Sequence, residues 1–382
     1  MIQYGRQQIS EDDIAAVVKV LRSDFLTQGQ EVPKFESAIC NYTGSSYGVA
    51  VNSGTSALHI ACLALNLGKG DYLWTTPISF VASSNCGLYC GARVDFVDID
   101  PSTWNISVQK LEEKLAQAKI NNKLPKVVVV VHLCGLSCDL IAINKLSIQY
   151  GFSVIEDASH ALGGKYNDQP IGSGLYSEIT TFSFHPVKSI TTGEGGMAVT
   201  NNKKLAERMR LLRTHGITKS QMQMTRPADG KWYYQQIALG FNYRISDIHA
   251  ALGVSQLQRL NDFIKKRSAI AKIYNDKFQH LPLQRQFHSA NTRSAHHIYV
   301  IRVDKSYRKK AIEELHFLGI HANVHYIPIY AQPFYQEMGF KAENFPESEA
   351  YYDEAITIPI HPGMSDENIN EVVEKLSLIL KI

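Results

Sequence analysis

Cysteine is sparse in this sequence and gives no sign of a disulfide framework. The 382 residues include only six cysteines, too few to staple a chain of this length, so a reducing compartment fits them better. Two pairs, Cys86 with Cys90 and Cys134 with Cys138, are each separated by three residues and raise the question of a zinc site. The paired cysteines of structural zinc sites usually lie closer together, and buried free cysteine is common. We therefore expect no metal site.

Long apolar runs and blocks of one charge are also missing. No segment approaches the roughly 18 apolar residues that a membrane helix needs. Residues 1–14 lack the basic-then-apolar pattern of a signal peptide, so we expect a cytoplasmic protein without a membrane partner. The 39 Lys and Arg residues nearly balance the 36 Asp and Glu residues, and no basic block is long enough to indicate a nucleic-acid partner. No G-x-G-x-x-G motif opens a helix after the first strand, which argues against a dinucleotide enzyme.

Much of the chain alternates between apolar, β-branched runs and amphipathic helical patterns. Residues 126–132, KVVVVVH, form an unbroken run that is typical of a central parallel strand covered on both faces. Seven such runs are interleaved with helices, so we predict an α/β fold with a mainly parallel seven-stranded sheet. The predicted strands are a run from residue 48 and residues 71–77, 92–100, 126–132, 151–157, 179–184 and 196–201. The predicted helices span residues 12–23, 35–42, 55–67, 80–89, 139–150 and 203–212.

The last third of the chain has a different texture. A long helix is predicted from about residue 245 through residue 278, followed by a strand at 296–303, a helix at 304–319, a strand at 320–329 and a helix at 367–380. We therefore predict a large α/β domain over residues 1–262 and a smaller C-terminal α+β domain over residues 263–382. Residues 219–236 are polar and irregular and are predicted to be a mobile excursion. Residues 25–35 are predicted to be extended, either as a wall of a ligand cavity or as a plain connector.

The stretch 179–197, ITTFSFHPVKSITTGEGGM, holds the main candidate for catalysis. A strand ends at Pro186, and Lys188 follows in a segment bounded by Gly193, Gly195 and Gly196, where the backbone is free to turn around a ligand. An amine among apolar groups loses solvation of its charged form, so its pKa falls and it becomes available for a Schiff base. The competing interpretation is a surface lysine in a glycine-rich turn.

Two further features point to the same edge of the sheet. Ser53, Gly54 and Thr55 lie between a buried strand and a helix, where free N–H groups favour an anion such as phosphate, although Ser53 or Thr55 could simply cap the helix. Asp157 ends another parallel strand, where open α/β sheets bind ligands. A lysine, a carboxylate and a phosphate cradle are together the requirements of pyridoxal phosphate (PLP) chemistry.

The motifs NSGTSALH, TTPISFVASSN, EDASHALGG, SFHPVKSITTGEGG, RTHGI and GFNYRISDIHAALGVSQL occur in this order. Together they resemble the DegT/DnrJ family of nucleotide-sugar aminotransferases, which have PLP fold type I. The resemblance covers nearly the whole chain. It implies PLP as cofactor, with pyridoxamine phosphate as its aminated form, and a homodimer with shared active sites.

The resemblance also implies a role for each matching residue. Lys188 would bind the cofactor and move the proton, Asp157 would pair with the pyridine nitrogen, and His160 would lie beside the phenolic oxygen, where most of the family has glutamine. Lys188 also argues against the family's dehydratase branch, in which a histidine replaces the lysine. Phe80 would stack on the ring. The phosphate would be held by Gly54, Thr55, Ser183 and, from the other subunit, Asn242.

For the substrate, the resemblance is to the members that act on a UDP-linked 4-keto-6-deoxy-N-acetylhexosamine, with L-glutamate as donor, on the way to pseudaminic acid. The product would be UDP-4-amino-4,6-dideoxy-N-acetyl-β-L-altrosamine. The implied substrate-binding residues are Tyr4, Asp24, Phe25, Leu26, Thr27, Asn323, Val324, His325 and Tyr326. Arg213, His215 and Arg244 are available for the diphosphate, with no choice among them. The alternatives are a family member acting on a dTDP-linked 3- or 4-keto hexose and a PLP-binding regulator without turnover.

Overall fold

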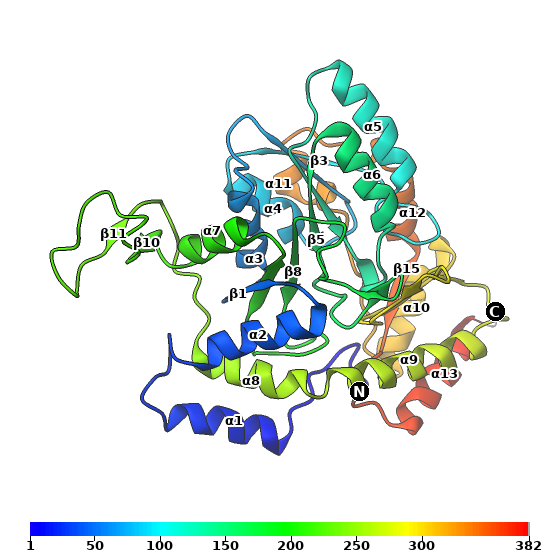
Figure 1. Cartoon of the computed structure of the whole chain (residues 1–382). Coiled ribbons are helices and arrows are strands. Elements are labelled where there is room, and N and C mark those ends of the chain that lie inside the picture. The colour runs from blue at the N-terminus through cyan, green and yellow to red at the C-terminus, as the bar shows by residue number, and fades with distance from the viewer. Residues whose placement is uncertain (381–382) are drawn as a thin grey trace.

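A mainly parallel sheet of seven strands forms the centre of the chain (Figure 1). The computed structural model describes residues 1–380. In this sheet only β9 runs antiparallel to its neighbours, β1 and β8. This confirms the predicted mainly parallel seven-stranded sheet. In spatial order the strands are β1 (Tyr47–Val51), β9 (Gly196–Thr200), β8 (Ile179–Ser183), β5 (Ser153–Asp157), β4 (Val127–Val131), β2 (Tyr72–Thr75) and β3 (Arg93–Phe96).

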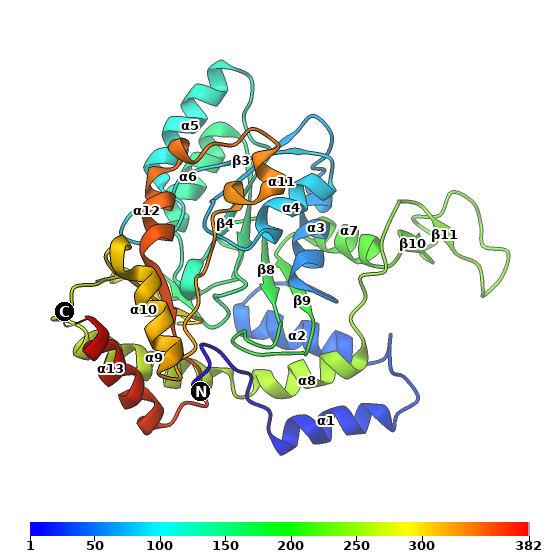
Figure 2. The same ribbon diagram turned by 180° about the vertical axis from the view of Figure 1, so that it is seen from behind.

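Helices cover both faces of the sheet (Figures 1 and 2). Side chains alternate between the faces of a strand, so Val128 and Val130 pack in one core while Val127 and Val129 pack in the other. All of β4 is buried, which is why it reads as an unbroken apolar run. The first core contains residues of α2 (Glu31–Thr43), α5 (Val108–Ile120) and α6 (Leu140–Tyr150). The second contains residues of α3 (Gly54–Ala64), α4 (Ala82–Tyr89) and α7 (Lys203–Arg213).

The segment predicted to be extended, residues 25–35, is partly helical, and that prediction is wrong beyond Gln30. Helix α1 (Glu11–Leu21) begins at a capping box formed by Ser10 and Asp13. Helix α2 begins at Glu31 without a side-chain cap of its own. The distant Asp247 serves this helix start instead: its carboxylate accepts from the N–H of Glu31, the first residue of α2, and from the N–H of Gly29 just before the helix, each at 2.8 Å.

The long helix predicted from residue 245 to 278 is two helices in the structure. Helix α8 (Asp247–Leu257) ends just before α9 (Leu260–Lys277) begins. Asp13 of α1 accepts hydrogen bonds from Ser255 and Gln256 and pairs with Arg259. We infer that these contacts with α1 fix the chain in its broken geometry at this point, against its local helical propensity.

The C-terminal part is built on a small antiparallel sheet of β12 (Gln284–Arg285), β14 (Tyr299–Arg302) and β15 (Ala355–Ile358). Helices α9, α10 (Lys305–Phe317) and α13 (Asp366–Leu380) pack against it. Residues 320–329, predicted as a strand, form only two isolated bridges, Ile2 with Ile320 and Asn323 with Thr357. That prediction is wrong: the segment pairs only at these two positions, and the strand that pairs with β14 is β15, which was not predicted.

The predicted boundary between residues 262 and 263 stays a prediction. Helix α9 crosses it, with Leu260 and Phe263 in a core of the large sheet and Ile270 and Tyr274 in the core of the small one. The segment 329–345 also returns to the large sheet and packs in its second core.

The remaining elements are η1 (Leu133–Gly135), β6 (Lys165–Tyr166), β7 (Gln169–Pro170), β10 (Ile217–Thr218), β11 (Gln235–Gln236), β13 (Thr292–Arg293), η2 (Ile329–Ala331), α11 (Pro333–Gln336), η3 (Ala342–Asn344) and α12 (Pro346–Glu354).

Residues 219–236, which follow β10 and end with β11, project away from the seven-stranded sheet and from the C-terminal sheet (Figures 1 and 2). Trp232 is 75% exposed there. The excursion is present as predicted, and its mobility stays a prediction.

Within residues 1–380, all six cysteines are free, and no three His, Cys, Asp or Glu side chains are grouped to hold a metal. None of the helices described in that range has the length and apolar character needed to cross a membrane.

Candidate active site

A cavity of about 420 Å³ opens at the carboxyl ends of the parallel strands. Of the seventeen residues predicted for the site, ten line it, and they come from segments far apart in the sequence. Strand ends β4, β5 and β8 form its floor, and the N-terminus of α3 forms one side. The ten residues are Tyr4, Gly54, Thr55, Phe80, Asp157, His160, Ser183, Lys188, His325 and Tyr326.

Lys188 lies five residues beyond β8, in a turn that folds back toward the strand. Its N–H donates to the carbonyl of His185 at 2.9 Å, and the N–H of Thr192 donates to the carbonyl of Phe184 at 3.0 Å. The turn therefore presents the amine to the cavity. Burial lowers the pKa of Lys188 to about 8, although the negative charge of Asp157 raises it. A large fraction of the amine is neutral near pH 8 and able to act as a nucleophile or a base.

The lowered pKa of Lys188 predicts a gain in stability when the amine is removed from cofactor-free protein. The pKa of lysine is near 10.5 in the unfolded chain and about 8 in the fold. This shift destabilises the folded state by at most about 3.4 kcal/mol, and water in the cavity reduces that free energy. Lys188→Met should therefore raise the free energy of unfolding at pH 7. The difference should shrink as pH rises from 8 to 10.5, because there the unfolded state binds the extra proton.

Urea denaturation of cofactor-free parental protein and of Lys188→Met, at pH 7 and at pH 9.5, measures this difference. Lys126→Met is the control, because Lys126 is paired with Asp71 at 2.8 Å outside the cavity. Equal stabilities of parental protein and Lys188→Met at pH 7 would show that the amine is not desolvated.

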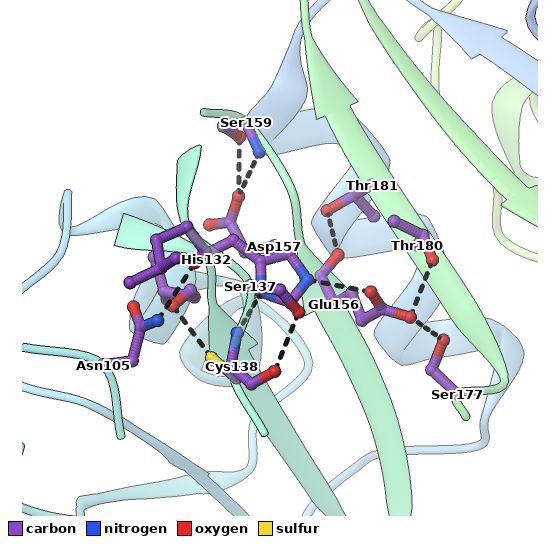
Figure 3. Close-up of polar contacts among 12 residues, drawn as sticks. Asn105, His132, Ser137, Cys138, Glu156, Asp157, Ser159, Ser177, Thr180 and Thr181 are labelled. Carbon is purple, nitrogen blue, oxygen red and sulfur yellow. Dashed lines mark hydrogen bonds and ion pairs between the residues drawn. The ribbon is translucent and has the colours of Figure 1, made fainter. Parts of the chain in front are cut away.

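Asp157 is a buried carboxylate that is held on both oxygens. Its Oδ1 accepts from the N–H of Ser159 at 3.1 Å and from the Ser159 hydroxyl at 2.6 Å, and its Oδ2 accepts from the Ser83 hydroxyl at 2.7 Å. Figure 3 shows the pair of contacts with Ser159. These donors fix the direction of the carboxylate at the end of β5, and none of them is a cation. The arrangement leaves its negative charge available to a cationic group in the cavity.

The N-terminus of α3 forms a cradle of the right chemistry for a phosphate. Ser53 is the N-cap and accepts from the N–H of Ser56 at 3.1 Å, so its capping role is confirmed. Gly54 and Thr55 follow in the first turn and line the cavity, where helix N–H groups lack intrahelical partners. A Cβ on Gly54 would lie 2.9 Å from Cβ of Ser183 and 3.2 Å from its Oγ. Only glycine lets Ser183 approach this helix end.

Gly54→Ala is therefore expected to weaken cofactor binding, with an increase of about tenfold or more in its Kd, because the methyl group pushes Ser183 away from the cradle. Fluorescence titration of cofactor-free protein with PLP measures this change. Gly68→Ala is the control, because the closest neighbour to its Cβ would be the Cys90 carbonyl, at 4.0 Å. Unchanged affinity in Gly54→Ala would contradict a phosphate site at this helix.

Histidine and tyrosine side chains form the wall opposite α3. His160 Nε2 lies 3.1 Å from the Tyr326 hydroxyl, and the ring of His160 packs on that of His297 with centroids 4.3 Å apart. The Nδ1 atoms of His160 and His297 are buried without a hydrogen-bond partner. Burial, reinforced by the charge of Lys188, lowers the pKa of both His160 and His297, so both rings are neutral. Such unpaired buried atoms indicate a ligand that completes the site.

Several cavity residues were missed by the sequence analysis. His297 was not predicted for the site. It lies just before β14, which begins at Tyr299, and it gave no local signal because its contact with His160 is made only in the folded chain. The other missed lining residues are Leu58, Ser79, Ala82, Val131, Ser159, His185, Val187 and Glu194. Ser53, which the sequence placed beside Gly54 and Thr55, also lines the cavity.

Seven predicted residues do not line this cavity: Asp24, Phe25, Leu26, Thr27, Asn242, Asn323 and Val324. The segment 24–27 connects α1 to α2, where the carbonyl of Leu26 accepts from the N–H of Asp247. Asn242 pairs with Thr214, and Asn323 pairs with Thr357. Arg213, a candidate for the diphosphate, is already bound to Glu36 at 2.6 Å and to the carbonyl of Ala50 at 2.8 Å.

The cavity residues fit PLP in the chemistry of their donors. The volume lies within the range of small-molecule sites. It presents an amine of lowered pKa, a fixed carboxylate, and a helix N-terminus that a Cβ at position 54 would obstruct. Phe80, with 58% of its surface exposed, offers an aromatic face at the cavity.

Two relatives from the curated proteins match essentially the whole chain. The spore coat polysaccharide biosynthesis protein SpsC of Bacillus subtilis is 36% identical over 389 residues, covering 100% of this chain and 97% of its own. The UDP-4-amino-4,6-dideoxy-N-acetyl-beta-L-altrosamine transaminase of Campylobacter jejuni is 36% identical over 393 residues, covering 100% of this chain and 98% of its own.

Solved structures agree with the fold throughout. PseC of Helicobacter pylori, an aminotransferase involved in the biosynthesis of pseudoaminic acid, superposes with a TM-score of 0.90 at 32% identity, covering 100% of this chain and 99% of its own. A sugar aminotransferase of Streptococcus pneumoniae, Spr1654, has been solved in its PMP form and superposes with a TM-score of 0.91 at 28% identity, covering 100% of this chain and 99% of its own.

The sequence model of the DegT/DnrJ/EryC1/StrS aminotransferase family matches residues 7–377. The predicted fold type I and the predicted cofactor are thereby confirmed. Because the match spans nearly the full chain and the cavity presents a lysine, a carboxylate and a phosphate cradle, this chain belongs to the DegT/DnrJ/EryC1/StrS family and is a PLP-dependent sugar aminotransferase.

Proposed function

We propose that the enzyme transfers an amino group from L-glutamate to C4 of a UDP-linked 4-keto-6-deoxy-N-acetylhexosamine. The product is UDP-4-amino-4,6-dideoxy-N-acetyl-β-L-altrosamine, made in the cytoplasm on the way to pseudaminic acid. The observation that supports transamination most directly is the presence of Lys188 and Asp157 in one cavity. The choice of sugar is supported by the names of the C. jejuni relative and the H. pylori structure.

The bound cofactor supplies an aldehyde that exchanges amines and a ring that accepts electrons from the reacting carbon. In our proposal, Asp157 holds a proton at the ring nitrogen and Phe80 stacks on the ring. Ser183 and the N–H groups of Gly54 and Thr55 bind the phosphate. His160 binds the phenolic oxygen, as a neutral ring that donates or accepts one hydrogen bond.

Lys188 holds the cofactor through Nζ and then acts as the base and acid that moves a proton at the sugar carbon. Its pKa of about 8 suits this work, because a group that both takes and returns a proton is most effective when its pKa is near the working pH. Glutamate and sugar use the same Lys188 in succession, so ping-pong kinetics is expected.

Tyr4, His325 and Tyr326 form the part of the cavity that we assign to the sugar. The rings of Tyr4 and His325 lie 5.1 Å apart, and burial lowers the pKa of His325 to about 4, so its ring is neutral. Neutral aromatic and polar groups suit hydroxyl and amide groups better than charges. No arginine lines this cavity in residues 1–380. Cations for the diphosphate and the glutamate carboxylates therefore have to come from outside this lining.

We propose a homodimer in which the partner completes the site, including Asn242 at the phosphate. This assignment accounts for the absence of Asn242 from the cavity of its own chain. Coexpression of a Lys188→Ala chain with an Asn242→Ala chain tests it. Each heterodimer should regain one intact site, so the mixture should recover up to about a quarter of parental activity, while each variant alone stays low. Activity no higher in the mixture than in either variant would contradict shared sites.

The decisive experiment for the function is a visible-range spectrum of the purified protein. Adding L-glutamate should remove the band of the lysine-bound cofactor and release 2-oxoglutarate, and adding the UDP-4-keto sugar should restore the band. Exclusive use of a dTDP-linked 3- or 4-keto hexose would overturn the choice of sugar. An unchanged band and no keto acid would indicate a PLP-binding regulator.

A further inference from the structure

A cluster of buried polar side chains lies directly behind Asp157, outside the cavity lining (Figure 3). Glu156 precedes Asp157 on β5, so the two carboxylates leave the strand on opposite faces of the sheet. Asp157 lines the cavity, whereas Glu156, only 2% exposed, does not. Burying a carboxylate in the interior is costly unless donors surround it. Its presence there therefore calls for an explanation beyond packing.

Donors from three segments satisfy the Glu156 carboxylate. Its Oε2 accepts from His132 Nε2 at 2.8 Å, just past the end of β4. Its Oε1 accepts from the Ser177 hydroxyl at 2.5 Å and from the Thr180 hydroxyl of β8 at 3.2 Å. The side chain thus ties β5 to the strand on either side of it, as the dashed contacts in Figure 3 show.

His132 is fixed in turn by the chain around it. Its ring is fully buried, and Nδ1 accepts from the backbone N–H of Cys138 at 3.1 Å. Its own backbone N–H donates to the carbonyl of Asp157 at 3.2 Å. His132 therefore holds Glu156 through its ring and Asp157 through its backbone.

The same cluster extends to the strand that leads to the catalytic lysine. Thr180 and Thr181 of β8 pair with Glu156 and Asp157 in the sheet, and the Thr181 hydroxyl donates to the carbonyl of Glu156 at 3.2 Å. Ser183 is the last residue of β8, and Lys188 follows the strand. The strand ends that present the carboxylate and the amine are consequently joined by side chains, in addition to the sheet hydrogen bonds.

We propose that Glu156 and His132 are positioning residues for the transamination, which hold Asp157 in register with the β8 segment from behind the sheet. This inference rests on the proposed role of Asp157 at the ring nitrogen. Supporting residues of this kind keep a reacting group within the narrow tolerance that chemistry requires. Neither residue contacts the cavity, so they act through Asp157.

Replacing Glu156 tests the proposal on the holoenzyme. Glu156→Ala should raise the apparent Kd for PLP about tenfold and lower kcat about tenfold, with the KM for the sugar within about twofold, as typically follows loss of a supporting residue. Glu156→Gln keeps an acceptor for His132 and should restore both values to within about threefold of the parental protein.

Asp98→Ala is the matched control for lost stability. Asp98 is also a buried carboxylate at the end of a strand, where it accepts from the N–H groups of Glu347 and Ser348 and from the Ser348 hydroxyl, and it does not line the cavity. Asp98→Ala should lower the melting temperature, as Glu156→Ala does, but it should leave the Kd for PLP unchanged. If Glu156→Ala lowers the melting temperature and shifts nothing else, Glu156 is merely structural and the proposal is overturned.

Two further variants keep the test decisive. If Asp157→Asn leaves both Kd and kcat unchanged, the proposed role of Asp157 fails. If Asp157→Asn changes these values and Glu156→Ala does not, only the positioning role of Glu156 is overturned.

Should Glu156→Ala not fold, the double variant Ser177→Ala with Thr180→Val removes two donors while keeping the carboxylate. It should raise the Kd by about threefold, and a parental Kd there would overturn the proposal.

Discussion

Lys188→Ala is expected to lower kcat by about 10⁴-fold or more. Loss of proton transfer alone removes about 10²–10⁴-fold, and the variant also loses the nucleophile that holds the cofactor and releases the product amine. No second lysine lines the cavity within residues 1–380, so no other side-chain amine can replace Lys188 there. The burial that lowers the Lys188 pKa also keeps bulk water from replacing it efficiently as a base.

Two measurements check this result. Single-turnover rates with L-glutamate report proton transfer, and borohydride reduction followed by mass spectrometry should place the pyridoxyl group on Lys188 in the parental protein and on no residue in the variant. Lys126→Ala, outside the cavity, should keep parental activity. Parental transamination by Lys188→Ala would show that another group does this chemistry.

Asp157→Asn should lower kcat by about 10²–10³-fold. An asparagine of nearly the same shape keeps contacts with Ser159 and Ser83, but it has no negative charge to hold a proton on the ring nitrogen. Truncating or neutralising one member of a buried charged pair typically costs about 3–5 kcal/mol, and part of this loss is recovered because the amide still accepts a hydrogen bond.

The loss should be in kcat in both half-reactions, because the proposed role of Asp157 at the ring nitrogen is required in each. Stopped-flow measurement with glutamate alone, and then with the keto sugar alone, separates the two. Asp98→Asn is the control, because Asp98 is buried but outside the cavity. A deficit confined to the sugar half-reaction would indicate that Asp157 contacts substrate and not the cofactor ring.

The sheet and its main chemical groups could be predicted because their signals are local. The run at 127–131 is apolar throughout because β4 is covered on both faces, and it could be recognised without any knowledge of its neighbours. Asp157 ends one strand and Lys188 follows another, and strand ends of a parallel sheet meet at one edge. Their meeting in one cavity therefore followed from sequence order and from topology.

What could not be predicted depends on partners that are distant in sequence. Asp247 supplies the acceptors at the start of α2, and Asp13 accepts hydrogen bonds from Ser255 and Gln256 at the end of α8. Neither contact can be inferred from the local sequence at the start of α2 or at the end of α8. His297 is a similar case, because a single histidine just before a strand has no periodicity from which its contact with His160 could be inferred.

The pairing of residues 2–4 with the C-terminal part has a consequence for how the enzyme is made. Ile2 exchanges hydrogen bonds with Gly319 and His321, and the carbonyl of Tyr4 accepts from the N–H of Ile360. During synthesis, residues 2–4 cannot form these hydrogen bonds until their partners, more than three hundred residues later in the chain, have been synthesised. Tyr4 can reach its position only after nearly the whole chain has been synthesised. We therefore expect nascent chains that stop before residue 319 to lack the part of the cavity that Tyr4 lines.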